Sequence, residues 1–189
     1  IQDKKKLISN VIFVIFIIGI VSIACILFKK YNYNNYQKSE YYAHKTSFLR
    51  DSKIKYNKSK SYKISSKDYN DAIFYKTIKT EKNTPYKITC KVKTENIETE
   101  KENSNAGANI AVLDTTEKSK SITGTNDWQE IEMFIDSKER EEINIGFRLG
   151  SYEDNCKGTA WFSDITIEKG NADTSNNWKF GIFLVDNID

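Results

Sequence analysis

An uncharged apolar segment at residues 7–28 constrains the fold of this chain more than any other feature. The segment reads LISNVIFVIFIIGIVSIACILF, and lysines lie on both sides of it. As an α-helix it would extend about 33 Å at ~1.5 Å per residue, enough to cross the ~30 Å hydrocarbon core of a bilayer. The sequence therefore predicts a transmembrane helix over 7–28, a short tail at 1–6, and a large polar portion after the helix.

Two other kinds of N-terminal segment share this apolar character. A cleaved signal peptide has a shorter apolar region and ends at a small-x-small site, but no such site lies between Phe28 and Tyr36. A lipoprotein signal would end at Cys25, but Ser22 stands where an aliphatic residue is expected, and the apolar run continues past the cysteine. We therefore favour an uncleaved anchor that contacts membrane lipid through 7–28.

The basic residues around the anchor indicate its orientation. Three lysines precede it and two follow it, and the more basic side tends to stay in the cytoplasm. The protein is therefore predicted to cross the cell membrane once, with the 1–6 tail inside and residues 31–189 outside the cell. Of the 29 basic and 26 acidic residues, five lysines and one aspartate lie in 1–30, which leaves 24 basic and 25 acidic residues elsewhere. The overall basic character thus gives no reason to expect nucleic-acid binding.

The residues that enzymes use most often are scarce in this chain. His44 is the one histidine, so neither a histidine-based catalytic triad nor a multi-histidine metal site can be built. Neighbouring carboxylates such as Glu141 and Glu142 lie in charge runs typical of solvated loops, and the sequence has no glycine-rich phosphate loop and no CxxC pair. We therefore expect no enzyme activity from this chain, and any catalytic domain would lie beyond Asp189.

The polar portion divides by composition into three parts. Residues 29–45 are polar and rich in tyrosine without a sustained period, which is typical of a spacer next to the membrane. Residues 46–170 contain short alternations of apolar and polar side chains, which predict β-strands. Residues 171–189 combine a polar break with an apolar run, which fits either a last strand of the same domain or the start of a further domain.

The alternating segments predict an antiparallel β-sandwich of the jelly-roll kind, so the expected fold class is all-β with one transmembrane α-helix in front. The expected strands are 62–65, 72–80, 86–94, 108–113, 128–135, 143–149, 158–168 and 178–185. The first two are expected to form a pair, and no strand is expected before Tyr62. In the clearest alternation, Ile145 and Phe147 are predicted to point into the core.

Three sequence motifs occur in order along the predicted sandwich. They are NTPYKIT at 83–89, GTNDWQ at 124–129 and GTAWFSDI at 158–165. Together they resemble carbohydrate-binding modules of the galactose-binding-like jelly-roll type, which occur on bacterial extracellular glycoside hydrolases and surface proteins. The resemblance covers roughly residues 50–169 and implies the same fold and a glycan ligand.

The resemblance also implies a structural calcium ion, which the family holds partly through an opening strand and the third motif. The family's asparagine and phenylalanine–glutamate pair are not found between Lys45 and Lys60, and Ser163 replaces the first acidic residue of the third motif. Asp164 is left as the candidate calcium ligand, whereas calcium takes six to eight oxygens. Without a metal, Asp164 would be an exposed strand residue.

A glycan site is expected on the polar faces of two segments predicted to be neighbouring strands, 128–135 and 142–149. The candidate ligand-binding residues are Glu130, Glu132, Asn144, Arg148 and Trp128. Consecutive antiparallel strands usually pair, so the four polar side chains would converge. The alternatives are a solvated face, an ion pair between Arg148 and Glu132, and a tryptophan packed at the edge of the core. If this face is not the site, the loops around Tyr69 and Tyr152 are the next candidates.

Cys90 and Cys156 lie in the predicted extracellular domain, where disulfides persist. They can form a disulfide only if their Cα atoms lie within about 7 Å of each other. Otherwise both are buried free thiols, and the sequence leaves both alternatives open.

The sequence thus predicts a membrane-anchored, extracellular, non-catalytic module that binds a polysaccharide or cell-surface glycan. It fits the N-terminal part of a larger surface enzyme. The alternative is a β-sandwich without a ligand that spaces or docks a downstream domain.

Overall fold

The computed structural model describes residues 13–23, 37–40, 46–171 and 179–181. The chain divides into two units, Ile1–Asn35 and Tyr36–Asp189. In the first unit, residues 13–23 are helical, and their side chains are exposed. Among the described residues, no helix is both long enough and apolar enough to span a bilayer. The rest of the predicted 7–28 helix lies outside the described residues.

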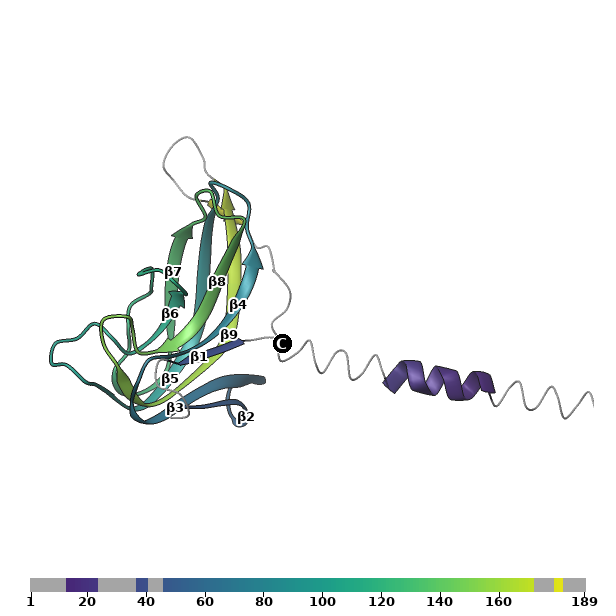
Figure 1. The fold of residues 1–189 in the computed structure, drawn as a ribbon, viewed down its shortest axis with the longest axis horizontal. Coiled ribbons are helices and arrows are strands. Elements are labelled where there is room, and N and C mark those ends of the chain that lie inside the picture. Colours follow the sequence, from purple (N-terminus) through teal and green to yellow (C-terminus); the bar gives the residue numbers. More distant parts are fainter. Residues whose placement is uncertain (1–12, 24–36, 41–45, 172–178, 182–189) are drawn as a thin grey trace, which may run out of the picture. The chain divides into compact units, whose positions relative to one another are not determined.

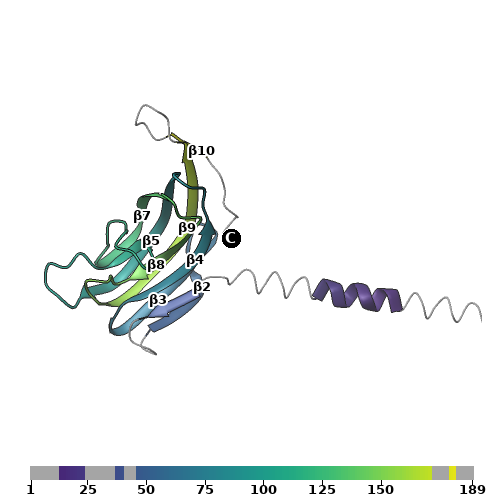
Figure 2. The same ribbon diagram turned by 45° about the horizontal axis from the view of Figure 1, so that its top comes forward.

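The described part of the second unit is built from β-strands. They are β1 (Gln37–Glu40), β2 (Thr46–Tyr56), β3 (Ser59–Asn70), β4 (Ala72–Lys79), β5 (Pro85–Thr99), β6 (Ala108–Val112), β7 (Gly124–Asp136), β8 (Glu142–Leu149), β9 (Cys156–Asn171) and β10 (Lys179–Gly181). One sheet has the order β1-β4-β8-β6, and the other has the order β2-β3-β9-β5-β7 (Figure 1), with β10 added beside β9 (Figure 2). All the strand pairs are antiparallel. The predicted antiparallel β-sandwich is confirmed.

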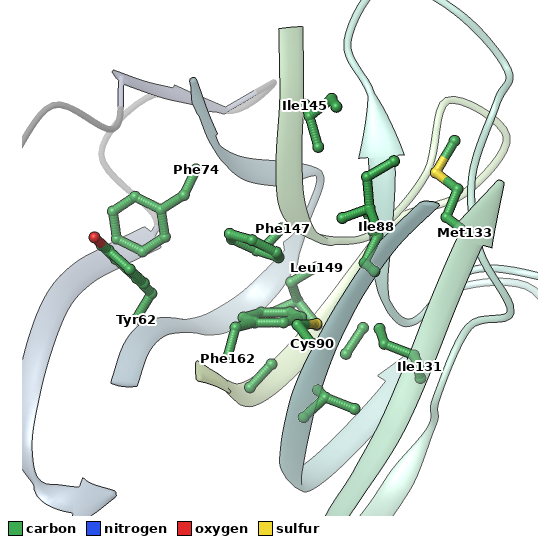
Figure 3. Close-up of a cluster of buried hydrophobic side chains, with 14 of the residues drawn as sticks. Tyr62, Phe74, Ile88, Cys90, Ile131, Met133, Ile145, Phe147, Leu149 and Phe162 are labelled. Atoms are coloured by element: carbon green, nitrogen blue, oxygen red, sulfur yellow. The ribbon is translucent and has the colours of Figure 1, made fainter. Parts of the chain in front are cut away.

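The core lies between the two sheets and follows the predicted phase of the strands. Ile145 and Phe147 are 3% and 1% exposed, as their alternation on β8 predicted. Figure 3 shows the Phe147 ring of β8 beside the Phe162 ring of β9, and their centroids are 5.3 Å apart. Since β8 and β9 belong to different sheets, this ring contact joins the two layers.

Two strands that were not predicted begin the second unit. β1 occupies four residues of the predicted spacer and pairs with β4. β2 pairs with β3 along the edge of the six-stranded sheet (Figure 2). Many β2 side chains are exposed or only half-buried, because an edge strand is partly solvated. Its sequence therefore lacks the strong contrast between apolar and polar faces by which strands are recognised.

The predicted pairing of the first two strands is wrong. β3 pairs with β2 and β9, whereas β4 pairs with β1 and β8 in the other sheet. Only Asp71 separates β3 from β4, so the chain passes from one sheet to the other within a single residue. The short link at Asp71 is a crossover between layers, although its brevity suggested a hairpin.

The end of the chain adds one short strand to the six-stranded sheet. β10 pairs with β9 through Phe180 opposite Gly170. Residues 172–178 and 182–189 lie outside the described residues. The choice between a closing strand and a further domain therefore stays open for the predicted 178–185 segment as a whole.

Candidate functional site

The polar cluster predicted from β7 and β8 does not form, because these strands lie in different sheets. On β7, Glu130 pairs with Lys91 at 2.9 Å, and Glu132 pairs with Lys87 at 3.2 Å. Both carboxylates are more than half exposed. They are ordinary cross-strand ion pairs on the outer face of the six-stranded sheet.

The candidate residues on β8 lie on the outer face of the four-stranded sheet and are also paired. Asn144 Oδ1 accepts a hydrogen bond from Thr77 Oγ1 at 2.6 Å. The Arg148 side chain is only 3% exposed, and its guanidinium donates two hydrogen bonds to the Asp71 carboxylate. Arg148 therefore has Asp71 as its partner, and the predicted alternative of an Arg148–Glu132 pair is wrong.

Trp128 lies half-buried on the outer face of the six-stranded sheet. Its ring meets the Tyr56 ring edge-on, with the centroids 5.7 Å apart. Tyr56 comes from β2 at the opposite edge of the same sheet, so the β2–β3 hairpin reaches across the sheet. Trp128 is thus separated from the candidate residues on β8 by the thickness of the sandwich.

Cys90 and Cys156 are buried free thiols. Cys90 lies in the middle of β5, whereas Cys156 pairs with Thr99 at the end of the same strand. At ~3.3 Å per residue the nine intervening steps amount to roughly 30 Å, so a disulfide between them is excluded. Burial raises the pKa of Cys156 to about 12 and also raises that of Cys90. Neither thiol is a reactive thiolate at neutral pH.

Asp164 is the residue that the resemblance implies as a calcium ligand. It has a φ of 51° and is exposed on β9. It lies in a bulge where β9 has two residues, Asp164 and Ile165, opposite Cys90. Within the described ranges, no three His, Cys, Asp or Glu side chains are placed to hold a metal ion. Asp164 therefore has no cluster of carboxylates around it in the described part of the chain, and its role as a calcium ligand stays a prediction.

The loop between β8 and β9 carries the strongest candidate site in the described part of the chain. Tyr152 is 51% exposed. One face of its ring covers the Arg148 guanidinium, whose central carbon is 4.0 Å from the ring centroid. Its hydroxyl accepts a hydrogen bond from the backbone N–H of Asp114 at 2.5 Å. The aromatic ring is thus fixed at two points while half of its surface stays open to solvent.

A pocket of about 290 Å³ lies beside this ring. We call it the Tyr152 site. It is lined by Asp71, Glu100, Lys101, Ser151, Tyr152, Glu153, Asp154 and Asn155. These residues come from the crossover between the sheets, from the segment after β5, and from the loop between β8 and β9. The site therefore forms only in the folded sandwich.

Hydrogen bonds within the loop hold the walls of the Tyr152 site. Ser151 Oγ accepts hydrogen bonds from the backbone N–H groups of Glu153 at 3.2 Å and Asp154 at 3.1 Å. Lys101 Nζ donates to the Glu153 carbonyl at 2.6 Å. Asn155 Nδ2 donates to Glu100 Oε2 at 2.7 Å. The loop is thereby tied to the segment that follows β5.

Gly150 allows this loop to approach the crossover closely. Its φ is 120°, a conformation that other residues rarely adopt. A Cβ on Gly150 would lie 2.9 Å from the Asp71 Cα, so the backbones would have to separate. The glycine therefore keeps the wall formed by Asp71 next to the wall formed by Ser151 to Asn155.

Asp154 leaves one polar atom of the site without a partner. The residue is 5% exposed, and its Oδ2 accepts a hydrogen bond from the Lys101 backbone N–H at 3.2 Å. Its Oδ1 is buried and has no hydrogen-bond partner. A buried carboxylate oxygen in this state carries an uncompensated desolvation cost. A donor group placed next to it would be stabilised.

The main residues of the Tyr152 site were not among the predicted ligand-binding residues. The sequence named the loops around Tyr69 and Tyr152 only as the next candidates. Tyr152 follows the Gly150–Ser151 pair, which is the one local sequence signal of a loop that could expose an aromatic residue. Asp71 and Asp154 are far apart in the sequence and meet only through the crossover. Tyr69 lies under the Lys157 ammonium at 4.9 Å and does not line the pocket.

Comparisons with known proteins give similarities in structure only. No family model matches the sequence, and no curated protein matches it. An enzymatically active domain of tailspike protein 4 from bacteriophage CBA120 has a TM-score of 0.48 at 15% identity, over 71% of this chain and 19% of that one. TmCBM61 in complex with beta-1,4-galactotriose has a TM-score of 0.44 at 12% identity, over 71% and 88% of the two chains.

The CBM22-1–GH10 modules of Clostridium thermocellum xylanase 10B, complexed with xylohexaose, have a TM-score of 0.43 at 14% identity. This match covers 69% of the present chain and 25% of that chain. At these identities and TM-scores, the similarities do not identify a ligand for this protein.

Proposed function

We propose that the β-sandwich is a non-catalytic glycan-binding module whose ligand occupies the Tyr152 site. The observation that carries the proposal is the Tyr152 ring, which is fixed by Arg148 and Asp114 and is half exposed beside a pocket of about 290 Å³. Sugar rings present apolar C–H faces and many hydroxyl groups. A fixed aromatic face with convergent polar groups is complementary to both.

The polar groups of the site suit hydroxyl donors. Asp71, Glu100, Glu153 and Asp154 supply carboxylate acceptors, and Asp154 Oδ1 lacks a donor. The three sequence motifs also support a glycan ligand, because they resemble galactose-binding-like modules of the jelly-roll type.

We further propose that 7–28 anchors the protein in the cell membrane and that the sandwich lies outside the cell. The length and uncharged composition of the segment, together with its flanking lysines, support this placement. Protease added to intact cells should degrade the sandwich and spare the 1–6 tail. Protection of the sandwich would contradict the proposed orientation.

A glycan array probed with the full chain in detergent micelles tests the proposed function. Tyr152→Ala should weaken binding at least tenfold, which corresponds to about 1.4 kcal/mol, because the ring supplies the apolar contact. Phe134→Ala is the matched control, since Phe134 on β7 is also about half exposed at 52% and lies outside the pocket lining. The control variant should bind as the wild type does.

Two results would contradict the proposal. If Tyr152→Ala retains wild-type affinity for a glycan that the protein binds, the ligand occupies another surface. If the folded protein binds no glycan, the alternative of a sandwich that spaces or docks another domain is favoured.

A further inference from the structure

The β2–β3 hairpin forms a strongly basic surface apart from the Tyr152 site. The hairpin turns through Asn57 and Lys58, and Asn57 has the positive φ of 51° that a tight turn uses. Four lysines lie on and near the turn, namely Lys53, Lys55, Lys58 and Lys60. All four side chains are exposed. We call these residues the basic hairpin.

Within residues 46–171, the lysines of the basic hairpin form no ion pair. Among the described residues, the ion pairs use other lysines, and none of these four has a side-chain partner. Asp51 is the one nearby carboxylate in β2. Its oxygens accept hydrogen bonds from the Lys53 and Ile54 N–H groups and from Trp161 Nε1. These bonds keep the pKa of Asp51 below its usual value and fix the carboxylate inside the hairpin.

The strand register concentrates this charge further. Lys55 and Lys60 are direct cross-strand partners, and like charges that face each other across strands are destabilising. Tyr56 points toward the sheet, where its ring lies 5.4 Å from Lys91 Nζ. Because side chains alternate along a strand, Lys55 and its partner Lys60 point away from the sheet. The two lysine side chains therefore leave the same side of the hairpin from paired positions, and both are exposed to solvent.

The hairpin is held in place by contacts with the outer face of the six-stranded sheet. Trp161 on β9 donates to Asp51 at 3.0 Å, and Ser163 Oγ donates to the Ser59 carbonyl at 3.4 Å. Tyr56 meets Trp128 on β7. These contacts fix the backbone on which the lysines stand, so a ligand would not have to order the hairpin before it binds.

From these observations we infer that the basic hairpin binds a chain-like polyanion with repeating phosphate groups. A bound phosphate would relieve the repulsion between Lys55 and Lys60, and its neighbours in the polymer would meet Lys53 and Lys58. All four residues are lysines, whose ammonium groups act as point charges. Such point charges are common ligands of phosphate groups, which they bind without the planar, bidentate geometry that arginine uses. The surface is therefore suited to phosphate density along a chain.

Titration of the full chain in detergent micelles with long-chain sodium polyphosphate tests this inference. The test variant combines Lys55→Gln, Lys58→Gln and Lys60→Gln. It should bind polyphosphate at least tenfold more weakly than the wild type. The slope of log affinity against log salt should fall by about 2, at ~0.7 per neutralised phosphate of a single-stranded polyanion.

The matched control variant removes three lysines that are exposed but lie on separate elements. It combines Lys79→Gln, Lys120→Gln and Lys138→Gln, which change the net charge equally. The control should lose less than about threefold in affinity, and both variants should keep the wild-type circular dichroism spectrum.

Three outcomes would overturn the inference. Absence of polyphosphate binding would show that the hairpin is a solvated surface. Equal weakening by the two triple variants would show that net charge alone is responsible. Equal affinity for polyglutamate of the same length would show that phosphate is not the recognised group. None of these outcomes depends on glycan binding at the Tyr152 site.

Discussion

Replacement of Arg148, which is buried on the outer face of the four-stranded sheet, should destabilise the protein strongly. The Arg148 and Asp71 side chains are 3% and 15% exposed. Removing one member of a buried ion pair costs ~3–5 kcal/mol, because the other charge stays desolvated. Since Asp71 is partly exposed and recovers some hydration, we expect Arg148→Ala to lower the free energy of unfolding by about 3 kcal/mol.

Urea unfolding followed by circular dichroism measures this loss. With a slope of ~2 kcal/mol per molar urea, the midpoint should fall by about 1.5 M. Lys87→Ala is the control, since the Lys87 and Glu132 side chains are 26% and 51% exposed, and loss of such a surface pair should cost no more than ~1 kcal/mol. A double-mutant cycle with Asp71→Asn isolates the coupling between the two side chains.

A small loss in the free energy of unfolding of Arg148→Ala would refute this prediction. If Arg148→Ala costs less than about 1 kcal/mol and the cycle gives a coupling energy near zero, the pair is solvated in the folded protein. That result would also remove the reason for a fixed Tyr152 ring, because Arg148 supports one of its faces.

Two further measurements test the core. Phe147→Ala should cost about 3–5 kcal/mol in urea unfolding, because it leaves a cavity beside Phe162; a cost below about 1 kcal/mol would contradict the packing of the two sheets. Burial raises the pKa of Cys156 from 9.0 to about 12, so the native state keeps a proton that the unfolded state loses above pH 9. The stability contributed by this thiol should be fully present below pH 9 and should decline by up to ~1.4 kcal/mol per pH unit toward pH 12. Cys156→Ala should remove this part of the decline and leave the part that Cys90 contributes, because burial also raises the pKa of Cys90; an unchanged decline in the variant would assign it to other groups.

The sequence predicted those features that depend on local alternation. Ile145 and Phe147 alternate with polar residues on β8, so their burial followed from the strand period alone. The same pattern placed Arg148 on the outer face, which is where it lies. Its burial could not be predicted, because it depends on Asp71 and Tyr152, which reach it through the crossover and the following loop.

Strand pairing was harder to predict from the sequence than strand position. β3 and β4 are separated by Asp71 alone, and a short connection usually joins neighbours in one sheet. The predicted pairing of β7 with β8 failed for the same reason. The predicted glycan site depended on that pairing. Because the pairing is wrong, its residues lie on two different sheets.

The crossover at Asp71 also determines how the Tyr152 site responds to distant changes. One wall of the pocket begins where the chain leaves the six-stranded sheet for the four-stranded sheet. Another wall is the loop in which it returns from β8 to β9. If one sheet slides over the other, these walls shift relative to each other. Core substitutions at the contact between Phe147 and Phe162 should therefore change the shape of a pocket that neither residue touches, and a ligand in that pocket would resist the sliding.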